Sequence, residues 1–519
     1  MFEEPVSEIL RALPARIAEP VQQWAQTSPD HPALVEANSS WTYQQLNSVL
    51  ARTQAWLGES GVRPGDRVLI AGENCRGFIS VLLAATELGA WPVLVNARLS
   101  AGELEAVRNH CGPRRVIYTT SSPHASEHAK SQESLIPGPA ELGPVAMGPL
   151  NENVEPEPAD SDPSARVAAV IYTSGTTGLP KGVMLTHRNL LFIAAVSARI
   201  RSLTPRDRLY GVLPMTHAVG LSVVLLGSFL SGATLYLAPR FDPMSARLAL
   251  EKDQLTVVLG VPSMFAQFLQ YAKLRRLTNL NLPALRIISS SGAPLDSPTK
   301  KATEAFFGMP LHNGYGITEC SPTIAQTRVE SPRSDTAVGP LLPGVEATFL
   351  DANHRPVDPG EIGELRVRGP NIMKGYYRDP QATSEAVDAE GWFNTRDLAK
   401  LEDGNLFIVG RTKDLIVRSG FNVYPIEVET VLNAHPSVVQ SAVIGRSIEG
   451  DEEILAFVQP LPEMAVTPAD LSEFIARRLA PYKRPSRILI MSDLPMTATG
   501  KIAKAELRKA AEDGKFAKK

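Results

Sequence analysis

The chain has 519 residues, of which 44% are hydrophobic and 21% charged. This composition supports a large core and excludes wholesale disorder, and the length suits roughly three domains or two unequal ones. Lys and Arg number 52 against 55 Asp and Glu, a net charge of −3, so the chain lacks the basic excess of a nucleic-acid-binding protein.

The three cysteines, Cys75, Cys111 and Cys320, lie far apart and suit neither a disulfide framework nor a zinc cluster. The N-terminus, MFEEPVSEIL, is acidic and lacks the basic start and apolar segment of a secretory signal. Together these features predict a large, soluble, cytoplasmic protein. The sequence leaves the oligomeric state open, a homodimer included.

The N-terminal third alternates helix and strand signals. Thr42 and Gln45 form a capping box that predicts the start of a helix. The apolar segments RVLIAG (67–72) and WPVLVN (91–96) predict strands, with a helix over residues 77–89 between them. Alternation at this spacing predicts βαβ units with a mostly parallel sheet.

Residues 121–165 interrupt this rhythm, because they are rich in proline, serine, glutamate and glycine. We expect a solvent-exposed excursion and not a domain boundary, since the strand-like VAAVIYTS (167–174) follows at once. His124 and His128 have a spacing that suits metal binding on a helix, but the surroundings are helix-poor and no Glu follows His124. We therefore expect two solvated histidines.

From Ala218 to Pro239 no residue is charged, and the segment is long enough to span a bilayer. Glycines and serines interrupt it, and Gly232 divides it into a helix-length part and the strand-like ATLYLA (233–238). We expect a buried helix followed by a strand. The alternative is contact with a membrane, of a peripheral kind.

The pattern of predicted helices and strands changes near Arg411, after which the predicted elements are shorter. Residues 427–445 and 468–491 each predict a helix that leads to a strand. The remaining length suits a small α+β domain, so we place a domain boundary near Arg411.

The strongest chemical signal is YTSGTTGLPKG, residues 172–182. Its glycines and hydroxyl residues suit a loop whose backbone N–H groups bind an anion, and Lys181 adds a positive charge for phosphate oxygens. The loop is not a Walker A motif, because Gly175 and Lys181 do not fit that spacing. The segment predicts a phosphate-binding loop of another kind.

This loop and further segments in the same order resemble the motifs of the adenylate-forming superfamily, which includes acyl-CoA synthetases, peptide-synthetase adenylation domains and luciferases. The further segments are LPMTHAVG (213–220), SSSGAPL (289–295), NGYGITE (313–319), GELRVRGP (363–370), GWFNTRDLA (391–399), GRTKDLIVRSGFNVYPIEVE (410–429) and LPMTATGKI (494–502). The resemblance covers nearly the whole chain. It implies an α/β fold with a large N-terminal multi-sheet domain (1–411) and a small mobile C-terminal α+β domain (412–519).

The resemblance implies binding of ATP and Mg²⁺. Tyr315 offers an aromatic face for adenine, Asp397 accepts the ribose hydroxyls, and Glu319 binds the metal with help from Thr173. Relatives more often have Gly where this chain has Arg396. The implied nucleotide-binding residues are Thr173, Ser174, Gly175, Thr176, Thr177, Gly178, Lys181, Gly292, Ala293, Pro294, Asn313, Gly314, Tyr315, Gly316, Thr318, Asp397, Arg411 and Lys501.

The resemblance also implies three catalytic residues, Lys501, His217 and Lys181. Attack of a carboxylate on the α-phosphorus concentrates negative charge, which the positioned Lys501 ammonium stabilises. His217 gates the site of the acyl carboxylate. The implied acyl pocket is uncharged and suits an apolar tail; its residues are His217, Met215, Val219, Met264, Ser290, Gly314 and Cys320.

For the second half-reaction the resemblance implies CoA as co-substrate. Lys413 is the hinge, Ser419 and Gly420 line the pantetheine tunnel, and Arg484 contacts a CoA phosphate. A side chain at Gly420 would block a narrow channel.

These implications define an AMP-forming carboxylic acid–CoA ligase, with a fatty acid as first expectation and an aryl acid as second, since Gly314 opens the pocket floor. The alternative is a stand-alone adenylation enzyme that loads a carrier-protein thiol. No carrier-type DSL motif follows Lys501, so a carrier would be a separate chain. A non-catalytic acyl-nucleotide sensor is expected to lack Lys501, Glu319 or Lys181, and all three are present.

Overall fold

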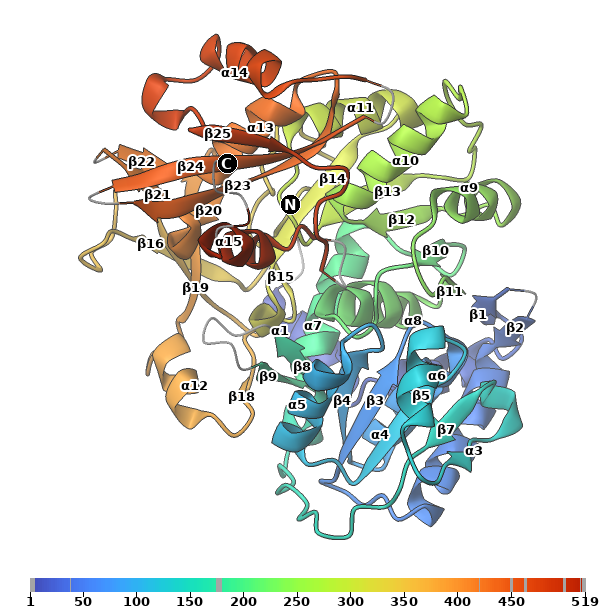
Figure 1. The fold of residues 1–519 in the computed structure, drawn as a ribbon. Helices are drawn as coiled ribbons and strands as arrows, with labels where there is room; N and C mark the ends of the chain where they lie inside the picture. The colour runs from blue at the N-terminus through green and yellow to red at the C-terminus, as the bar shows by residue number, and fades with distance from the viewer. Residues whose placement is uncertain are drawn as a thin grey trace.

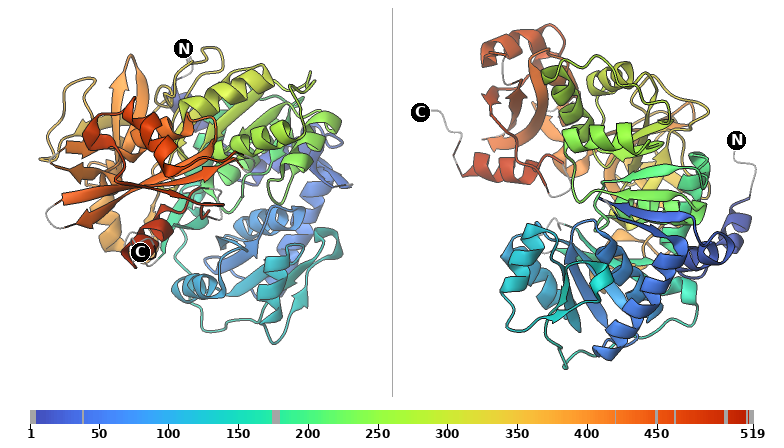
Figure 2. Two further views of the ribbon diagram at one scale, coloured as in Figure 1. Left: turned by 45° about the horizontal axis from the view of Figure 1, so that its top comes forward. Right: turned by 90° about the vertical axis from the view of Figure 1, so that its right-hand side faces the viewer.

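The structure is a computed structural model that describes residues 5–37, 39–173, 180–419, 421–448, 451–461, 464–497, 501–513 and 515. A large N-terminal unit contains two sheets, and a smaller C-terminal domain packs beside the second of them (Figures 1 and 2). The implied α/β class, with a large multi-sheet part and a small α+β part, is therefore confirmed.

The first sheet has a parallel centre, as the sequence predicts. In spatial order its strands are β18 (Gly375–Tyr376), β9 (Lys181–Thr186), β8 (Val167–Thr173), β4 (Trp91–Asn96), β3 (Arg67–Gly72), β5 (Arg115–Thr119), β7 (Val145–Met147) and β6 (Ile136–Pro137). The helices that connect or cover them are α3 (Tyr43–Glu59), α4 (Arg76–Glu87), α5 (Ala101–Cys111) and α6 (Pro123–Lys130). Thr42 and Gln45 form the predicted capping box of α3.

The second sheet is also parallel at its centre and has antiparallel strands at both edges. In spatial order it contains β15 (Thr323–Gln326), β14 (Leu311–Gly316), β13 (Ile287–Ser291), β12 (Val257–Gly260), β10 (Arg208–Gly211), β11 (Thr234–Leu237), β1 (Pro32–Glu36) and β2 (Ser39–Thr42). Helices α9 (Pro243–Lys252), α10 (Pro262–Leu274) and α11 (Ser297–Phe307) share a core with one face of this sheet.

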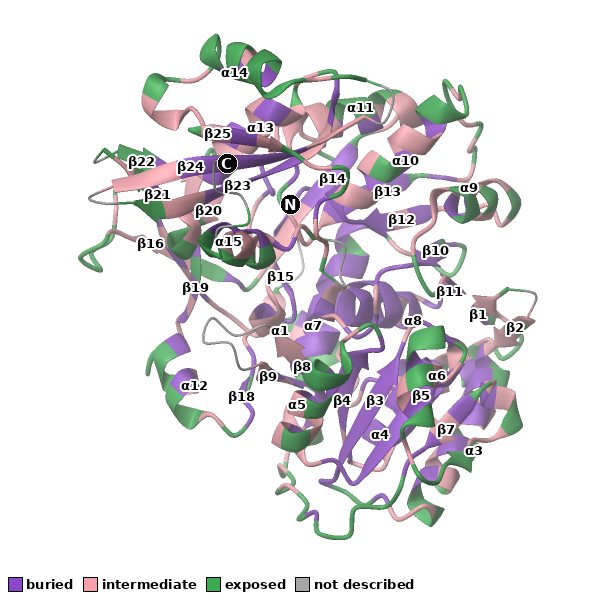
Figure 3. Cartoon of the chain, viewed as in Figure 1, coloured by how far each residue is buried: buried purple, intermediate pink, exposed green. Residues whose placement is uncertain are grey.

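One core lies between the two sheets, because alternate strand residues point to opposite faces. Val68 and Ile70 of β3 belong to this central core, whereas Leu69 belongs to the outer core under α5. Helix α7 (His187–Ile200) is buried along almost its whole length and lies in the central layer (Figure 3). Helices α1 (Val6–Ala12) and α2 (Glu19–Thr27) pack against α7 and α3.

The uncharged segment 218–239 forms a buried helix and a strand, as predicted. It contains a π-helix, η3 (Val219–Leu226), then α8 (Gly227–Ser231) and β11. Its burial against α7 explains the absence of charge. Among the residues that the structure describes, no helix is long and apolar enough to cross a membrane.

Residues 121–165 contain more regular structure than the sequence predicts. They form α6 and then β6 and β7, which extend the edge of the first sheet, besides the 3₁₀ turns η1 (Ala140–Leu142) and η2 (Pro163–Ala165). Strands this short give too few alternating residues for a sequence signal. His124 and His128 do lie on a helix, so the helix-poor interpretation is wrong, and His128 Nε2 is 3.0 Å from the Ala97 carbonyl.

A separate antiparallel sheet joins the N-terminal unit to the C-terminal domain. Its strands are β16 (Glu346–Leu350), β17 (Gly363–Arg368), β19 (Phe393–Glu402) and β20 (Asn405–Arg411), and α12 (Pro380–Ala386) precedes β19. The chain then passes through the turn η5 (Thr412–Asp414) into the hairpin of β21 (Ile416–Arg418) and β22 (Phe421–Val423).

The C-terminal domain is a small α+β fold, in agreement with the two predicted helix–strand units. Helix α13 (Pro425–Asn433) precedes β23 (Val438–Ile448), and α14 (Pro468–Ala476) precedes η6 (Pro481–Lys483) and β25 (Arg487–Ile490). β24 (Asp451–Pro460) pairs with both strands. Val443 faces the core under α13 and α14, whereas Ile444 faces α15 (Lys504–Glu512).

Candidate active site

Lys501, which belongs to the C-terminal domain, lies close to residues of the N-terminal unit. A Cβ atom built at Gly292, just after β13, would lie 3.8 Å from Lys501 Cε. Burial lowers the pKa of His217, and the positive charge of Lys501 lowers it further. Burial raises the pKa of Asp397, and the charge of Lys501 acts against that rise. Loss of hydration lowers the pKa of Lys501 itself, and the nearby Arg411 guanidinium lowers it further. Four predicted residues from separate segments therefore surround this ammonium group.

Two polar contacts hold the domains in this arrangement. The Asn433 amide on α13 donates to Asp296 Oδ2 at 3.2 Å, and Asp296 is also the N-cap of α11. At the junction, Thr412 Oγ1 donates to Glu364 Oε1 of β17 at 3.0 Å. The predicted hinge residue Lys413 lies next to this second contact in η5 and is exposed.

Asp397 has both carboxylate oxygens occupied by protein groups. It is 2% exposed; Arg411 Nε donates to Oδ1 at 2.9 Å, and the Tyr315 hydroxyl donates to Oδ2. Burial raises the pKa of Asp397, and Arg411 and Tyr315 act against that rise. The pairing of Asp397 with Arg411 in the β19–β20 register places both at the domain junction.

Glu319, the predicted metal ligand, is held by an aromatic residue that the sequence did not single out. Tyr376 donates its hydroxyl to Glu319 Oε1 at 2.9 Å. Lys181 Nζ lies 5.0 Å from the centre of the Tyr376 ring, within cation–π range. Tyr376 therefore links the predicted metal ligand to the predicted phosphate-binding lysine.

The donor set fits Mg²⁺ that is also bound to phosphates. Among the described residues, no group of three or more His, Cys, Asp or Glu side chains could hold a metal. Mg²⁺ typically binds one or two protein oxygens and completes its shell with water and phosphate oxygens. Glu319 supplies such an oxygen, and the Thr173 hydroxyl is of the same hard type.

The predicted phosphate loop is described only at its ends. Thr173 pairs with Lys181 across β8 and β9, which are antiparallel neighbours in the first sheet. The remaining predicted loop residues, Ser174, Gly175, Thr176, Thr177 and Gly178, lie outside the described residues.

The other predicted nucleotide residues gather where β13 and β14 end. Ser291 pairs with Gly314 in parallel register, so Gly292, Ala293 and Pro294 leave β13 beside the NGYG segment. The Asn313 side chain donates to the carbonyls of Thr336 and Ala337 at 3.0 and 3.4 Å. Gly316 ends β14, and Thr318 begins the turn η4 (Thr318–Cys320). Ligands of open parallel sheets bind at such carboxyl ends of strands.

His217 precedes the π-helix η3 and is kept neutral. Burial lowers the pKa of His217 to about 4, with a further contribution from the charge of Lys501. The His217 N–H donates to the Pro214 carbonyl at 3.0 Å. A Cβ atom at Gly220 would lie 2.2 Å from the same carbonyl oxygen, so the backbone around His217 requires glycine there.

The predicted acyl residues divide between the two faces of the second sheet. Ser290 pairs with Gly260, whose missing Cβ would face Phe265 and Met264 of α10. Gly314 is in register with Ser291 and thus faces the opposite way. Met215, Val219 and Cys320 belong to the central core, and Met264 contacts both cores.

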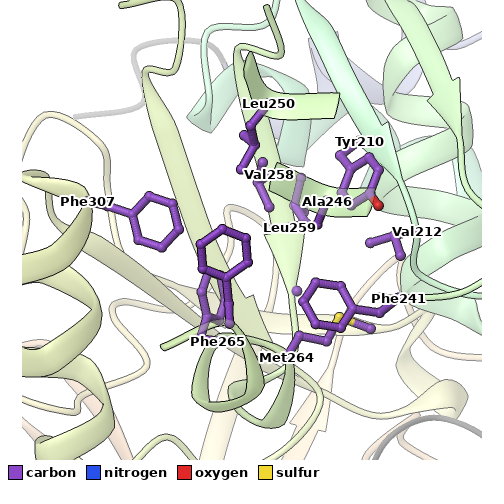
Figure 4. A pocket seen from close by; sticks show the side chains of 12 residues that line it. Tyr210, Val212, Phe241, Ala246, Leu250, Val258, Leu259, Met264, Phe265 and Phe307 are labelled. Carbon is purple, nitrogen blue, oxygen red and sulfur yellow. The ribbon is translucent and has the colours of Figure 1, made fainter. Parts of the chain in front are cut away.

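A small apolar cavity lies on the α10 face. Its free volume is about 30 Å³, and Met264, Phe265 and Phe307 are among its walls (Figure 4). This cavity could hold about one water molecule. The cavity is therefore too small for an acyl chain. Met264 lies between this cavity and the central core.

Of the predicted CoA-binding residues, Ser419 and Arg484 are described, and Gly420 lies outside the described residues. The Ser419 hydroxyl donates to Asp451 Oδ2 at 3.0 Å. Arg484 donates to the carbonyls of Leu479 and Ala476, both at 2.9 Å, near the end of α14. In this domain arrangement Arg484 thus binds its own domain.

Three residues that lie beside predicted site residues were not singled out from the sequence: Tyr376, Ser291 and Gln326. Tyr376 stands in a GYYRDP segment, where an aromatic pair beside an edge strand gives no functional signal. Ser291 and Gln326 flank Gly314 in neighbouring strands. Only the strand register, which the sequence does not show, identifies them.

The fold and these contacts define an adenylate-forming enzyme in which Lys501 of the C-terminal domain lies near Gly292, Arg411 and Asp397. The sequence model of the AMP-binding enzyme family matches residues 21–377, and that of the AMP-binding enzyme C-terminal domain matches residues 427–501. The chain belongs to this family, within the adenylate-forming acyl-CoA synthetases. It is an AMP-forming acid–thiol ligase that uses ATP, Mg²⁺ and CoA.

Similar proteins cover almost the whole chain. A feruloyl-CoA synthase of an Amycolatopsis species is 35% identical over 494 residues, 93% of this chain and 97% of that protein. 4-Coumarate–CoA ligase 2 of Oryza sativa subsp. japonica is 30% identical over 522 residues, 92% and 90% of the two chains. The o-succinylbenzoate coenzyme A synthetase of Bacillus subtilis, solved with ATP and magnesium ion, has a TM-score of 0.79 at 28% identity and covers 95% and 99% of the two chains.

Proposed function

We propose that this ligase activates an aryl acid, with a ring and a short linker to the carboxylate, and transfers it to CoA. The relatives described above are named for feruloyl, 4-coumarate and o-succinylbenzoate substrates. None of these names supports the first expectation from the sequence, a fatty acid. The uncharged residues of the predicted acyl pocket suit a neutral aromatic ring.

The observation that carries the adenylation role is the position of Lys501 beside Gly292 and near Asp397 and Arg411. In the proposed reaction, a carboxylate oxygen bonds to the α-phosphorus and the bond to the pyrophosphate oxygen breaks. The Lys501 ammonium stabilises the added negative charge, Lys181 faces the departing pyrophosphate, and Glu319 holds Mg²⁺. His217, being neutral, shields the acid without pairing with its carboxylate.

Ribose binding at Asp397 adds hydrogen bonds to those that the carboxylate already accepts. Both oxygens of Asp397 already accept hydrogen bonds from Arg411 and Tyr315. Each carboxylate oxygen has a second lone pair, so ribose hydroxyls can donate while Arg411 stays in place. Arg411 then still neutralises the negative charge of Asp397, because the ribose hydroxyls are uncharged and cannot do so.

In the second half-reaction the CoA sulfur bonds to the acyl carbon, AMP leaves with the electron pair of the broken C–O bond, and the thiol proton passes to solvent. Rotation at Lys413 removes Lys501 from the nucleotide and brings Ser419 and Gly420 to the acyl-AMP. Arg484 then becomes a contact for a CoA phosphate.

The test is AMP release and thioester formation with a panel of acids, with and without CoA. We expect kcat/KM for cinnamic and benzoic acids to exceed that for octanoate and palmitate by at least about tenfold. Preference for the fatty acids would overturn the aryl assignment. Pyrophosphate exchange without any CoA thioester would favour the carrier-protein alternative.

A further inference from the structure

Gln326, at the end of β15, is a buried amide with an unpaired oxygen. It is 2% exposed, and its Oε1 has no hydrogen-bond partner in the described part of the chain. An unpaired buried amide oxygen costs about 1–3 kcal/mol of stability, so such groups usually have a partner. The observation indicates that the partner of Gln326 arrives with a ligand.

Two other buried amides of the N-terminal unit, Asn74 and Asn313, are paired by the protein. Asn74 donates to the carbonyls of Gly211 and Leu213 at 3.0 and 2.9 Å and accepts from the Met215 N–H at 2.9 Å. Asn313, next to Gly314, donates to two carbonyls and accepts from the Gly314 N–H at 3.0 Å. The protein therefore pairs Asn74 and Asn313, whereas Gln326 and Asn371, whose amide donates to the Thr323 carbonyl of β15, each keep an unpaired oxygen. Of these two, Gln326 is the one in register with Gly314.

The side chain of Gln326 lies over the floor of the predicted acyl pocket. Gly314 pairs with Ser291 on one side and with Gln326 on the other. A Cβ atom at Gly314 would lie 3.8 Å from Gln326 Cγ and 3.8 Å from Ser291 Cβ. The three residues therefore form a row across one face of the sheet, and Gly314 leaves at its centre a space that a Cβ atom would fill at ordinary van der Waals distances.

This row starts at the reaction centre and ends away from it. Ser291 precedes Gly292, where an added Cβ atom would lie 3.8 Å from Lys501 Cε, whereas Gln326 is two strands farther along the sheet. Neighbouring strands lie about 4.8 Å apart, so the row spans about 10 Å. That is the order of the length of a phenylpropenoic acid. Tyr315 points to the opposite face, toward Asp397.

We propose that Gln326 is the specificity-determining residue that accepts a hydrogen bond from a ring hydroxyl at the distal end of the acid. The inference rests on the proposed function and narrows it from aryl acids to phenolic acids. The acceptor is a carbonyl oxygen, so the substrate group must be a donor. A site with such a buried acceptor discriminates against analogues that lack the donor, because their binding leaves the acceptor unpaired.

The experiment compares 4-hydroxycinnamic acid with 4-fluorocinnamic acid, whose substituent is similar in size but cannot donate. For the wild-type chain we expect kcat/KM to favour the hydroxy acid by about tenfold or more, mainly through KM. Gln326→Met keeps the volume and removes the acceptor. We expect that ratio to fall to about one, and the ligand-free Tm to rise because an unpaired amide is lost. Gln267→Leu, at an exposed glutamine of α10, is the matched control and should keep the wild-type ratio.

The outcomes distinguish a failure of the Gln326 inference from a failure of the proposed aryl-acid specificity. No thioester from either cinnamic acid would overturn the proposed aryl specificity. Turnover of both acids with equal kcat/KM in the wild type would overturn the inference and leave the aryl assignment standing. A wild-type ratio that survives in Gln326→Met would also overturn it, since the hydroxyl would then be recognised elsewhere.

Discussion

The nucleotide side and the acyl side of the active site hold their polar groups in opposite ways. On the nucleotide side, Asp397 is paired with Arg411 and Tyr315, and Glu319 is paired with Tyr376. On the acyl side, His217 is neutral and Gln326 carries an unpaired oxygen. A buried charge without a partner costs several kcal/mol, whereas a neutral amide costs about 1–3. Charged groups must therefore be paired within the protein, but a neutral group can remain unpaired until a substrate binds.

The largest expected effect tests the charged side. Lys501→Ala should reduce acyl-AMP formation at least about a hundredfold, equivalent to about 3 kcal/mol, because it removes the ammonium from the α-phosphate. Thioester formation from supplied acyl-AMP should change little, since the lysine then lies away from the site. Pyrophosphate exchange and single-turnover thiolation measure the two steps.

Lys509→Ala, at an exposed lysine of α15, is the matched control for loss of charge on the C-terminal domain. It should leave both half-reactions unchanged. Equal losses of both steps in Lys501→Ala would contradict the alternation of the domains.

The next effect concerns the neutral histidine on the acyl side. The folded pKa of His217 is about 4, below the value of about 6.5 for an unfolded chain. Between these values the unfolded chain takes up a proton that folded His217 does not. Neutral His217 therefore contributes to the free energy of unfolding. That contribution is fully present above about pH 6.5, and the free energy of unfolding falls by up to about 3 kcal/mol as the pH falls toward 4.

Urea unfolding at several pH values, wild type against His217→Ala, isolates this contribution, because all other titrating groups are shared. The wild-type stability should fall more steeply below pH 6.5. Lys501→Ala should raise the pKa of His217 in an NMR titration, since its charge lowers it. An unchanged pKa would show that the two sides of the site are not coupled in this way.

A third effect tests backbone packing on the acyl side. In Gly220→Ala the new Cβ would meet the Pro214 carbonyl oxygen at 2.2 Å, the same oxygen that accepts the His217 N–H. We expect a stability loss of about 1–3 kcal/mol and a larger rise in KM for the acid than for ATP. Thermal unfolding and steady-state kinetics measure both.

Gly227→Ala is the control within the same apolar segment, because its Cβ would meet nothing closer than 3.9 Å. It should be tolerated. If both variants raised the KM values for acid and ATP equally, Gly220 would have no special relation to His217.

The sequence predicted the fold correctly. The residues that it assigned to the nucleotide lie where neighbouring strands end, whereas those that it assigned to the acyl pocket divide between two faces of the second sheet. Motifs such as NGYGITE place charged and glycine residues at strand ends, where backbone geometry and chemistry constrain residue type together. The short strands β6 and β7 lack enough alternating residues to be recognised. The separation of Ser290 from Gly314, and the position of Gln326, depend on which strands are neighbours. That register is set by tertiary packing, and no local pattern encodes it.

The smallest expected effect concerns the nucleotide side, at the residue before Asp397. Arg396 immediately precedes Asp397 and has φ of 57°, in the left-handed region that favours glycine. Arg396→Gly should relieve this strain and raise stability by up to about 1 kcal/mol, less the entropy that glycine adds to the unfolded chain. Thermal unfolding measures the change.

Arg378 is the matched comparison, because its φ is 55° but its guanidinium lies 4.9 Å from the Tyr377 ring and donates to the His110 carbonyl. Arg378→Gly gains the same relief and loses these contacts, so it should not stabilise the protein. Burial and the charge of Glu319 raise the pKa of Tyr376, the hydroxyl donor to Glu319, and the charge of Arg396 acts against that rise. Arg396→Gly removes only this minor opposing charge, so ATP binding should change little while Tm rises. If Tm fell in Arg396→Gly, the arginine would be held by contacts that outweigh its backbone strain, and the nucleotide side would be more fully paired than Asp397 and Glu319 indicate.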